Sequence, residues 1–166
     1  MSIGPADLTV AVLGLGEAGS EIALGLARAG ARVRGFDPVV RPPAGVEAAA
    51  SDADACRDAD LVLSLTTAGE AETALRQALS GVSATAVYAD ANTAAAGLKQ
   101  RLAETALQDG LAFADIAIMA PVPGRGLRTP MVASGPGAAA ASSMLGACGA
   151  AGHAAVSNEL ARPLGA

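Results

Sequence analysis

Residues 8–19 read LTVAVLGLGEAG, an apolar run that ends in the motif G-x-G-x-x-G. An alanine- and leucine-rich segment with helical spacing follows over residues 17–29, and a second apolar segment, residues 32–36, is closed by Asp37. A strand before the glycines, a helix after them and an acid about 20 positions further on are typical of a β-α-β unit that binds a dinucleotide. This context, more than the glycines alone in a glycine-rich chain, predicts a dinucleotide site.

Each glycine of the motif has its own expected role. Gly14 permits the tight turn after the strand, Gly16 lets the backbone approach a pyrophosphate, and Gly19 lets the helix pack closely on the sheet. The free N–H groups and the positive dipole end of the helix then face the phosphates, and the carboxylate of Asp37 accepts from the adenosine ribose. The cofactor contacts predicted from this unit are Gly14, Leu15, Gly16, Glu17, Ala18, Gly19 and Asp37.

The composition limits the class of protein. The 166 residues are 52% hydrophobic, much of it alanine, so we expect one domain, residues 1–166, with a core of small and aliphatic side chains. A net charge of −5 argues against nucleic-acid binding. No basic stretch precedes an apolar run at the start, and the weakly polar residues 138–155 make a poor membrane span. We therefore expect a cytoplasmic protein that binds neither nucleic acid nor membrane.

The cysteines and the single histidine predict no catalytic or metal site. Cys56 and Cys148 are far apart in sequence and are interpreted as free thiols. His153 has no zinc-type partner spacing, and no G-x-S-x-G motif accompanies it. We expect neither a metal ion nor a nucleophile in this chain.

Strand and helix patterns alternate along the whole chain. This alternation predicts an α/β fold of the Rossmann type, with a doubly wound, mostly parallel sheet in a three-layer αβα arrangement. In such sheets the loops after successive strands converge on one cleft at the carboxyl ends. We expect strands at residues 8–13, 32–36, 46–50, 61–65, 84–89, 111–118, 131–134 and 153–157. We expect helices at residues 17–29 with Gly30 as C-cap, 52–58 with a Ser51–Asp54 capping box, 70–79, 137–148, and from a Thr93 cap to 108.

Four segments resemble the N-terminal domain of the β-hydroxyacid dehydrogenases. This superfamily includes 3-hydroxyisobutyrate dehydrogenase, 6-phosphogluconate dehydrogenase and the imine reductases, and the likeness covers nearly the whole chain. Residues 11–19 are similar to its glycine motif, residues 59–67 to its A-D-hydrophobic strand, and residues 90–93 to its D-x-S-T loop. Residues 117–124, AIMAPVPG, resemble a branch of phosphogluconate-dehydrogenase-like NAD-binding proteins.

The resemblance implies further site residues. The loops that follow two of the strands would lie along the cofactor, through Leu65, Thr66, Thr67 and Asn92. Where the superfamily carries D-A-P-V-S-G-G for its substrate, this chain has Met119, Ala120 and Pro121. Proline removes a backbone donor and methionine offers no hydroxyl, so a substrate other than a simple 3-hydroxy acid is expected.

The superfamily's proton-transfer lysine, by resemblance, belongs to a helical C-terminal domain that is absent from this chain. The only lysine here, Lys99, falls in the middle of an expected helix and is interpreted as part of a solvated helix face. No catalytic residue is therefore expected in these 166 residues. The helical domain would also form most of a homodimer, and without it an apolar face near the C-terminus would favour weak self-association.

Asp37 favours NAD, because a carboxylate there accepts from the 2′-hydroxyl and repels a 2′-phosphate. Arg41, four residues on, could offset that charge and leaves NADP open. The first functional hypothesis is an oxidoreductase domain for hydride transfer between nicotinamide and a hydroxy acid or imine substrate. The others are a stand-alone, non-catalytic dinucleotide-binding module and a nucleotide-dependent enzyme with other chemistry on the same fold.

Overall fold

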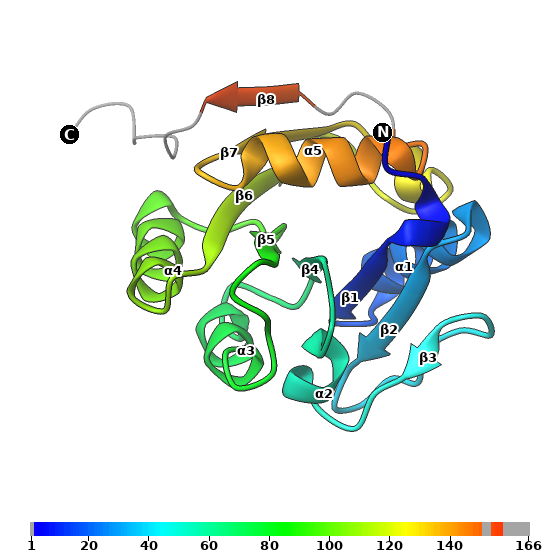
Figure 1. The fold of residues 1–166 in the computed structure, drawn as a ribbon, viewed down its shortest axis with the longest axis horizontal. Helices are drawn as coiled ribbons and strands as arrows, with labels where there is room; N and C mark the ends of the chain where they lie inside the picture. The colour runs from blue at the N-terminus through cyan, green and yellow to red at the C-terminus, as the bar shows by residue number, and fades with distance from the viewer. Residues whose placement is uncertain (1, 151–153, 158–166) are drawn as a thin grey trace.

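A single eight-stranded sheet runs through the molecule, in the order β3-β2-β1-β4-β5-β6-β7-β8 (Figure 1). The computed structural model describes residues 2–150 and 154–157. All neighbouring strands are parallel except β6 and β7. The strands are β1 (Thr9–Leu13), β2 (Arg32–Phe36), β3 (Glu47–Ala48), β4 (Leu61–Ser64), β5 (Val87–Asp90), β6 (Ala112–Ile118), β7 (Met131–Ser134) and β8 (Ala154–Ser157). This is the predicted Rossmann-type, doubly wound arrangement.

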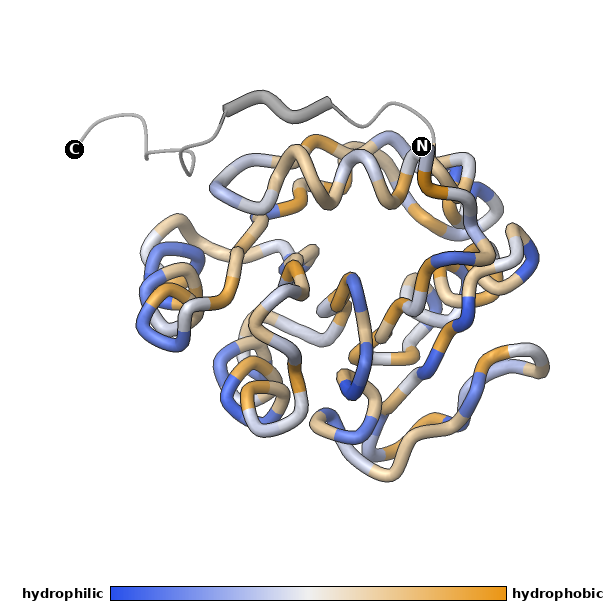
Figure 2. The backbone as a smooth tube through the Cα atoms, in the orientation of Figure 1, coloured by the Kyte–Doolittle hydropathy of each residue, from blue (hydrophilic) through white to orange (hydrophobic). Residues whose placement is uncertain are grey.

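Helices cover both faces of the sheet and make three layers (Figure 1). Along β1, Val10 and Val12 join the core under α1 and α5, whereas Ala11 and Leu13 join the core under α2, α3 and α4. Figure 2 shows hydrophilic and hydrophobic residues mixed along α3 and α4, while α5 carries no strongly hydrophilic stretch. The helices are α1 (Glu17–Ala29), α2 (Asp52–Cys56), α3 (Ala71–Ala78), α4 (Ala96–Gln108) and α5 (Ala138–Ala147), with 3-10 turns η1 (Pro5–Asp7) and η2 (Gly126–Arg128).

Local signals set most helix ends. The bounds expected for α1, β2 and β7 are confirmed, and Gly30 ends α1 at a φ of 111°. The Ser51 hydroxyl accepts from the backbone N–H of Asp54 at 3.0 Å, as a helix cap does. The Asp54 carboxylate accepts from the N–H of Ala50, one residue before the cap, so only half of the expected capping box forms.

Several expected boundaries were wrong. The strand expected at residues 46–50 is only Glu47–Ala48, and the helix expected at residues 52–58 ends at Cys56. The strand expected from residue 84 begins at Val87, because residues 83–86 form a turn closed by the bond from the Ala86 N–H to the Ser83 carbonyl. Thr93 does not cap α4, which starts at Ala96 after Ala95, and no side chain caps it. The last strand begins at Ala154, and the expected His153 start lies outside the described residues.

The strand order reverses between β1 and β4, which are neighbours although two strands separate them in sequence. Leu13 pairs with Phe36 on one side and with Ser64 on the other. The loops that follow these three strands therefore meet at the edge where such folds bind ligands. No helix in the described part of the chain combines the length and apolarity needed to cross a membrane.

Candidate functional site

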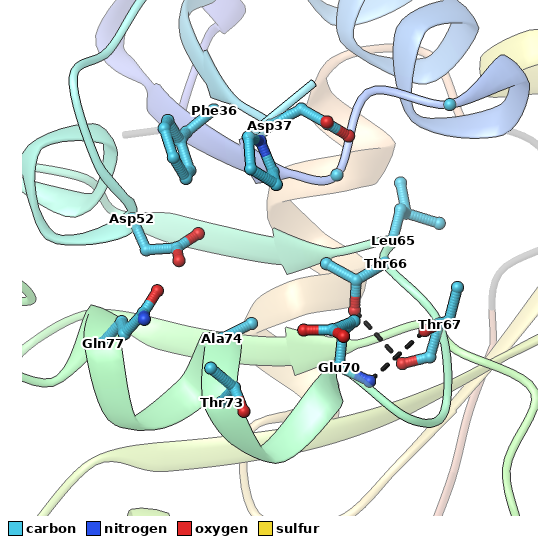
Figure 3. A pocket seen from close by; sticks show the side chains of 13 residues that line it. Phe36, Asp37, Asp52, Leu65, Thr66, Thr67, Glu70, Thr73, Ala74 and Gln77 are labelled. Atoms are coloured by element: carbon cyan, nitrogen blue, oxygen red, sulfur yellow. Dashed lines mark hydrogen bonds between the residues drawn. The ribbon is translucent and has the colours of Figure 1, made fainter. Parts of the chain in front are cut away.

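Two cavities open at this edge, on either side of Leu65 and Thr66, which line both. The larger measures about 520 Å³ and the smaller about 430 Å³. The larger (Figure 3), here the first cavity, is lined by Gly14, Gly16, Phe36, Asp37, Pro38, Asp52, Leu65, Thr66, Thr67, Glu70, Thr73, Ala74 and Gln77. The second cavity is lined by Glu17, Ala18, Leu65, Thr66, Ala91, Asn92, Thr93, Ile118, Ala120, Pro121, Val122 and Pro123.

The glycine loop has the geometry that the motif predicts. Gly14 adopts a φ of 91°, and a Cβ on it would lie 2.4 Å from the carbonyl oxygen of Leu65. A Cβ on Gly19 would lie 1.9 Å from the Gly14 carbonyl oxygen, so α1 approaches the turn as closely as only glycine allows. A Cβ on Gly16 would meet nothing within 4 Å. Gly16 thus leaves open space at the uncapped start of α1, where backbone N–H groups attract anions.

Asp37 anchors the loops around the first cavity. One carboxylate oxygen accepts from the N–H of Leu15 at 2.8 Å, and the other from those of Val39 and Val40 at 2.8 and 3.0 Å. Partial burial raises the pKa of Asp37, but the three backbone donors outweigh it and hold the pKa below its usual value. The carboxylate is therefore charged at neutral pH and joins the glycine loop to the end of β2, which the sequence alone did not indicate.

The first cavity is acidic, and no basic residue in the described part of the chain lines it. Asp37, Asp52 and Glu70 all contribute to its wall. Burial, followed by the charge of Asp37, raises the pKa of Asp52 to about 6. Arg41, considered above as a counter-charge, is not among the lining residues.

A second polar cluster lies at the ends of the next strands. Ser64, Asp90 and Asp115 occupy one cross-strand row of β4, β5 and β6. The side-chain amide of Asn92 donates to the carboxylate of Asp90 at 2.7 Å and approaches the hydroxyls of Ser64 and Thr66 at 3.3 Å. These bonds hold Asn92 in the wall of the second cavity.

Lys99 belongs to this cluster, so its interpretation as a solvated residue was wrong. It is only 6% exposed. Its Nζ lies 2.6 Å from Oδ2 of Asp90 and 2.7 Å from Oδ1 of Asp115, and it donates to the Asp90 carbonyl at 3.0 Å. The spacing Lys99–Leu102–Ala106 places the lysine on the inward face of α4, since residues three and four apart share a helix face. The burial of Lys99 could have been inferred from that spacing, together with the acids Asp90 and Asp115 on neighbouring strands.

The predicted contacts divide among three environments. Asp37 and Thr67 line the first cavity with Gly14 and Gly16, and Glu17, Ala18, Asn92, Ala120 and Pro121 line the second. Leu15 and Gly19 are buried and lie outside both linings, and Met119 is 62% exposed and also outside them. Their roles toward a ligand remain predictions. Asp52 and Gln77 line the first cavity without having been anticipated, because no local motif marks them.

Comparison with known proteins agrees with this geometry. A family model described as the NAD binding domain of 6-phosphogluconate dehydrogenase matches residues 9–152. No curated protein matches the sequence. Among solved structures, a conserved hypothetical protein from Sinorhizobium meliloti 1021 is similar at 29% identity and a TM-score of 0.83, covering 92% of this chain and 55% of that one.

Two named enzymes share the fold at lower identity. They are Mycobacterium tuberculosis 3-hydroxyisobutyrate dehydrogenase with L-serine, at 22% identity and a TM-score of 0.80, and an imine reductase from Myxococcus stipitatus with NADP+, at 17% and 0.78. Each match covers 92% of this chain, but only 55% and 56% of the respective enzyme, so the chain spans about half of their length. The glycine loop, the sheet order and the match over residues 9–152 lead to one assignment: this chain belongs to the family of NAD-binding domains of 6-phosphogluconate dehydrogenase.

Proposed function

We propose that the chain binds NAD across the two cavities and forms the cofactor half of an oxidoreductase. The adenosine would occupy the first cavity, the pyrophosphate would lie at Gly16 and the start of α1, and the nicotinamide would enter the second cavity. The observation that carries this proposal is the pair of cavities that meet at Leu65 and Thr66 beside Gly16, on which a Cβ would meet nothing within 4 Å. When bound, NAD supplies hydride transfer, with a hydroxy acid or an imine as the substrate class.

The charges of the first cavity support NAD over NADP. Asp37 stands at the end of β2, where a carboxylate accepts from the ribose 2′-hydroxyl. Asp37, Asp52 and Glu70 would together repel a 2′-phosphate, and no basic side chain in the described lining would attract it. Although one imine reductase of this fold was solved with NADP+, the acidic wall here favours the cofactor without the phosphate.

The second cavity supplies positioning groups more than proton-transfer groups. Asn92 is held by Asp90, and Ala120 and Pro121 offer no side-chain hydrogen bond. Glu17 is the one titratable residue in the described lining, and Lys99 is occupied by two carboxylates. We propose that the proton-transfer lysine belongs to a further helical domain of a longer, cytoplasmic protein, and that this domain also forms most of a homodimer interface.

The scarcity of titratable groups in the described lining of the second cavity supports one alternative function. Since no unpaired acid or base other than Glu17 lines the second cavity among the described residues, the chain could act as a non-catalytic dinucleotide-binding module. The two functions share the cofactor site. They differ in whether a substrate is reduced or oxidised when a helical partner domain is supplied.

Calorimetric titration with NAD+, NADH, NADP+ and NADPH tests the cofactor assignment. We expect NAD(H) to bind about tenfold or more tightly than NADP(H), because two like charges about 4 Å apart repel by about 1–4 kcal/mol and about 1.4 kcal/mol is a tenfold change in affinity. Asp37→Ala should reduce that preference to a few-fold. Asp109→Ala, which removes an exposed acid at the far end of α4, is the matched control and should leave it unchanged. Tighter binding of NADPH than of NADH, or no binding of any form, would contradict the proposal.

A further inference from the structure

Asp52 is a buried carboxylate that faces the first cavity without a partner. It follows the Ser51 cap as the first residue of α2, is 7% exposed, and lines the cavity. No described residue donates a hydrogen bond to its side chain or pairs with it as an ion. Buried acceptors are rarely left without a donor, because their lost hydration is not replaced. The Asp52 oxygens open onto the cavity, so their donor comes from what fills it, which is water in the free chain and a ligand when one is bound.

The other two acids of this wall are in a different situation. Asp37 already accepts from three backbone N–H groups. Glu70 is exposed and keeps its contact with solvent. Asp52 alone combines burial, an unfilled hydrogen-bonding capacity and an orientation into the cavity (Figure 3).

The neighbours of Asp52 describe the shape and chemistry of the missing donor. Phe36 and Ala74 provide apolar surface, and the amide of Gln77, on α3, points toward the Asp52 carboxylate (Figure 3). A flat, largely apolar ring with an N–H donor and an acceptor on one edge satisfies these groups together. Adenine is such a ring, since its 6-amino group donates and its ring nitrogens accept.

Resting on the proposed binding of NAD, we propose that Asp52 selects the purine base by accepting a hydrogen bond from the 6-amino group of adenine, with Gln77 beside it. A 6-oxo purine presents a carbonyl oxygen at that place. The carbonyl would meet the carboxylate as a second acceptor and leave both without a donor. Asp52 is thus a specificity-determining residue for the base of the cofactor.

The selectivity should depend on pH, because only the ionised carboxylate is restricted to accepting. Among the described groups around Asp52, Asp37 and Glu70 are acids, and burial raises the pKa of the Cys56 and Tyr88 side chains and keeps both neutral. The buried Arg34 of β2 also reaches α2, but its guanidinium donates to the Arg57 carbonyl and pairs with Glu47 rather than with Asp52. The pKa of Asp52 is raised to about 6 by burial and by Asp37. Below that pH the protonated acid could donate to a 6-oxo group, so discrimination should be greatest above about pH 7 and should fall as the pH drops through 6. The arginines at the end of α2 and on α3 pair elsewhere, Arg57 with Asp54 and Arg76 with Glu72.

The test is calorimetric binding of NAD+ and of nicotinamide hypoxanthine dinucleotide, whose base carries the 6-oxo group. For the unsubstituted chain at about pH 8 we expect NAD+ to bind roughly tenfold more tightly, the scale of one mispaired hydrogen bond to a charged group. Asp52→Asn, whose amide both donates and accepts, should reduce the ratio to about threefold or less. Asp54→Asn is the matched control, because Asp54 lies two residues further along α2 and outside the cavity lining. It should keep the tenfold ratio.

The possible results separate the two proposals. Equal affinity for both dinucleotides at about pH 8, or an unchanged ratio in Asp52→Asn, would overturn the role of Asp52 and leave the NAD site standing. Failure of the unsubstituted chain to bind either dinucleotide would overturn the proposed function and this inference with it. The comparison of two dinucleotides on the unsubstituted chain needs no variant to fold.

Discussion

Two groups of acids lie at the same edge of the sheet, and they differ in whether a basic side chain pairs with them. In the first cavity, Asp37, Asp52 and Glu70 stand without a basic residue in the described lining. At the ends of β5 and β6, Asp90 and Asp115 share the ammonium group of Lys99 at 2.6 and 2.7 Å. The first group faces a cavity without a counter-charge, whereas the two carboxylates of the second group share one ammonium group within the fold.

The difference separates groups that serve a ligand from groups that serve the fold. A buried carboxylate without a counter-charge raises the free energy of the folded state, so such a group is retained where a ligand can supply the donor. A buried carboxylate with its own lysine is already satisfied and acts by holding neighbours, here Asn92, in place. Each prediction below alters one side of this contrast.

Removing the lysine should have the largest effect. Lys99→Met leaves the buried Asp90 and the partly buried Asp115 without their cation, and we expect the free energy of unfolding to fall by about 3–5 kcal/mol. Urea unfolding followed by circular dichroism measures this. Arg101→Met on the same helix, which breaks only an exposed pair with Glu72, should cost less than about 1 kcal/mol. Similar losses in both variants would show that the lysine is not structurally special.

The glycine loop offers a paired test of packing against ligand approach. Gly19→Ala forces a Cβ into the Gly14 carbonyl and should lower the free energy of unfolding by about 1–3 kcal/mol. Gly16→Ala meets open space and should change stability by no more than about 0.5 kcal/mol. It should nevertheless weaken NAD+ binding about tenfold or more, because the new methyl occupies the approach to the pyrophosphate. Normal NAD+ affinity in Gly16→Ala would place the phosphates elsewhere.

The ionised carboxylate of Asp52 should lower the free energy of unfolding at neutral pH. Its pKa is near 6 in the folded protein against 3.8 in an unstructured chain, so the folded state binds the proton more tightly. Stability contributed by the neutral acid is therefore complete below about pH 4 and is lost as the pH rises through 6. We expect Asp52→Asn to unfold with a free energy about 1–3 kcal/mol higher than the unsubstituted chain at about pH 8, and with little difference near pH 4. A destabilised variant at pH 8 would mean that the carboxylate has a partner within the fold.

The smallest effect is expected at the cap that orients Asp52. Ser51→Ala removes the bond to the Asp54 N–H and should cost about 1 kcal/mol in thermal or urea unfolding. Because the first turn of α2, which carries Asp52, then frays more easily, the preference for NAD+ over its hypoxanthine analogue should also decline. Ser51→Asp, another good cap, should restore stability, and its failure to do so would assign the serine some other role.

The local part of the site could be predicted from sequence. The backbone geometry of Gly14, Gly16 and Gly19 follows from a contiguous motif whose spacing encodes a tight turn, an open backbone and close helix packing. Asp37 could be placed because the end of the second strand is a fixed point of the fold, although its bond to the Leu15 N–H could not be. The sheet layers were predicted for the same reason, since periodicity is a local property.

The residues that depend on register could not be predicted in the same way. Lys99 contacts Asp90 and Asp115 only because the register of β5 and β6 places these two acids in one cross-strand row. The spacing of apolar residues in α4 carries no information about that register. Asp52 has no motif of its own and becomes notable only when α2 places it against the loop after β2. Met119 lies outside both cavity linings, and its part in substrate binding remains a prediction.

The most direct test of the account is an NMR titration of the ¹⁵N-labelled chain with NAD+. We expect the backbone amide shifts to change at residues 14–19, at Asp37 and Asp52, and at residues 65–67, while the amide of Lys99 and those of the α4 turns beyond it stay in place. Loss of these changes in Gly16→Ala would confirm that they report binding at the glycine loop. Shift changes confined to other parts of the sheet, or none at saturating NAD+, would contradict the assignment of this cleft as the cofactor site.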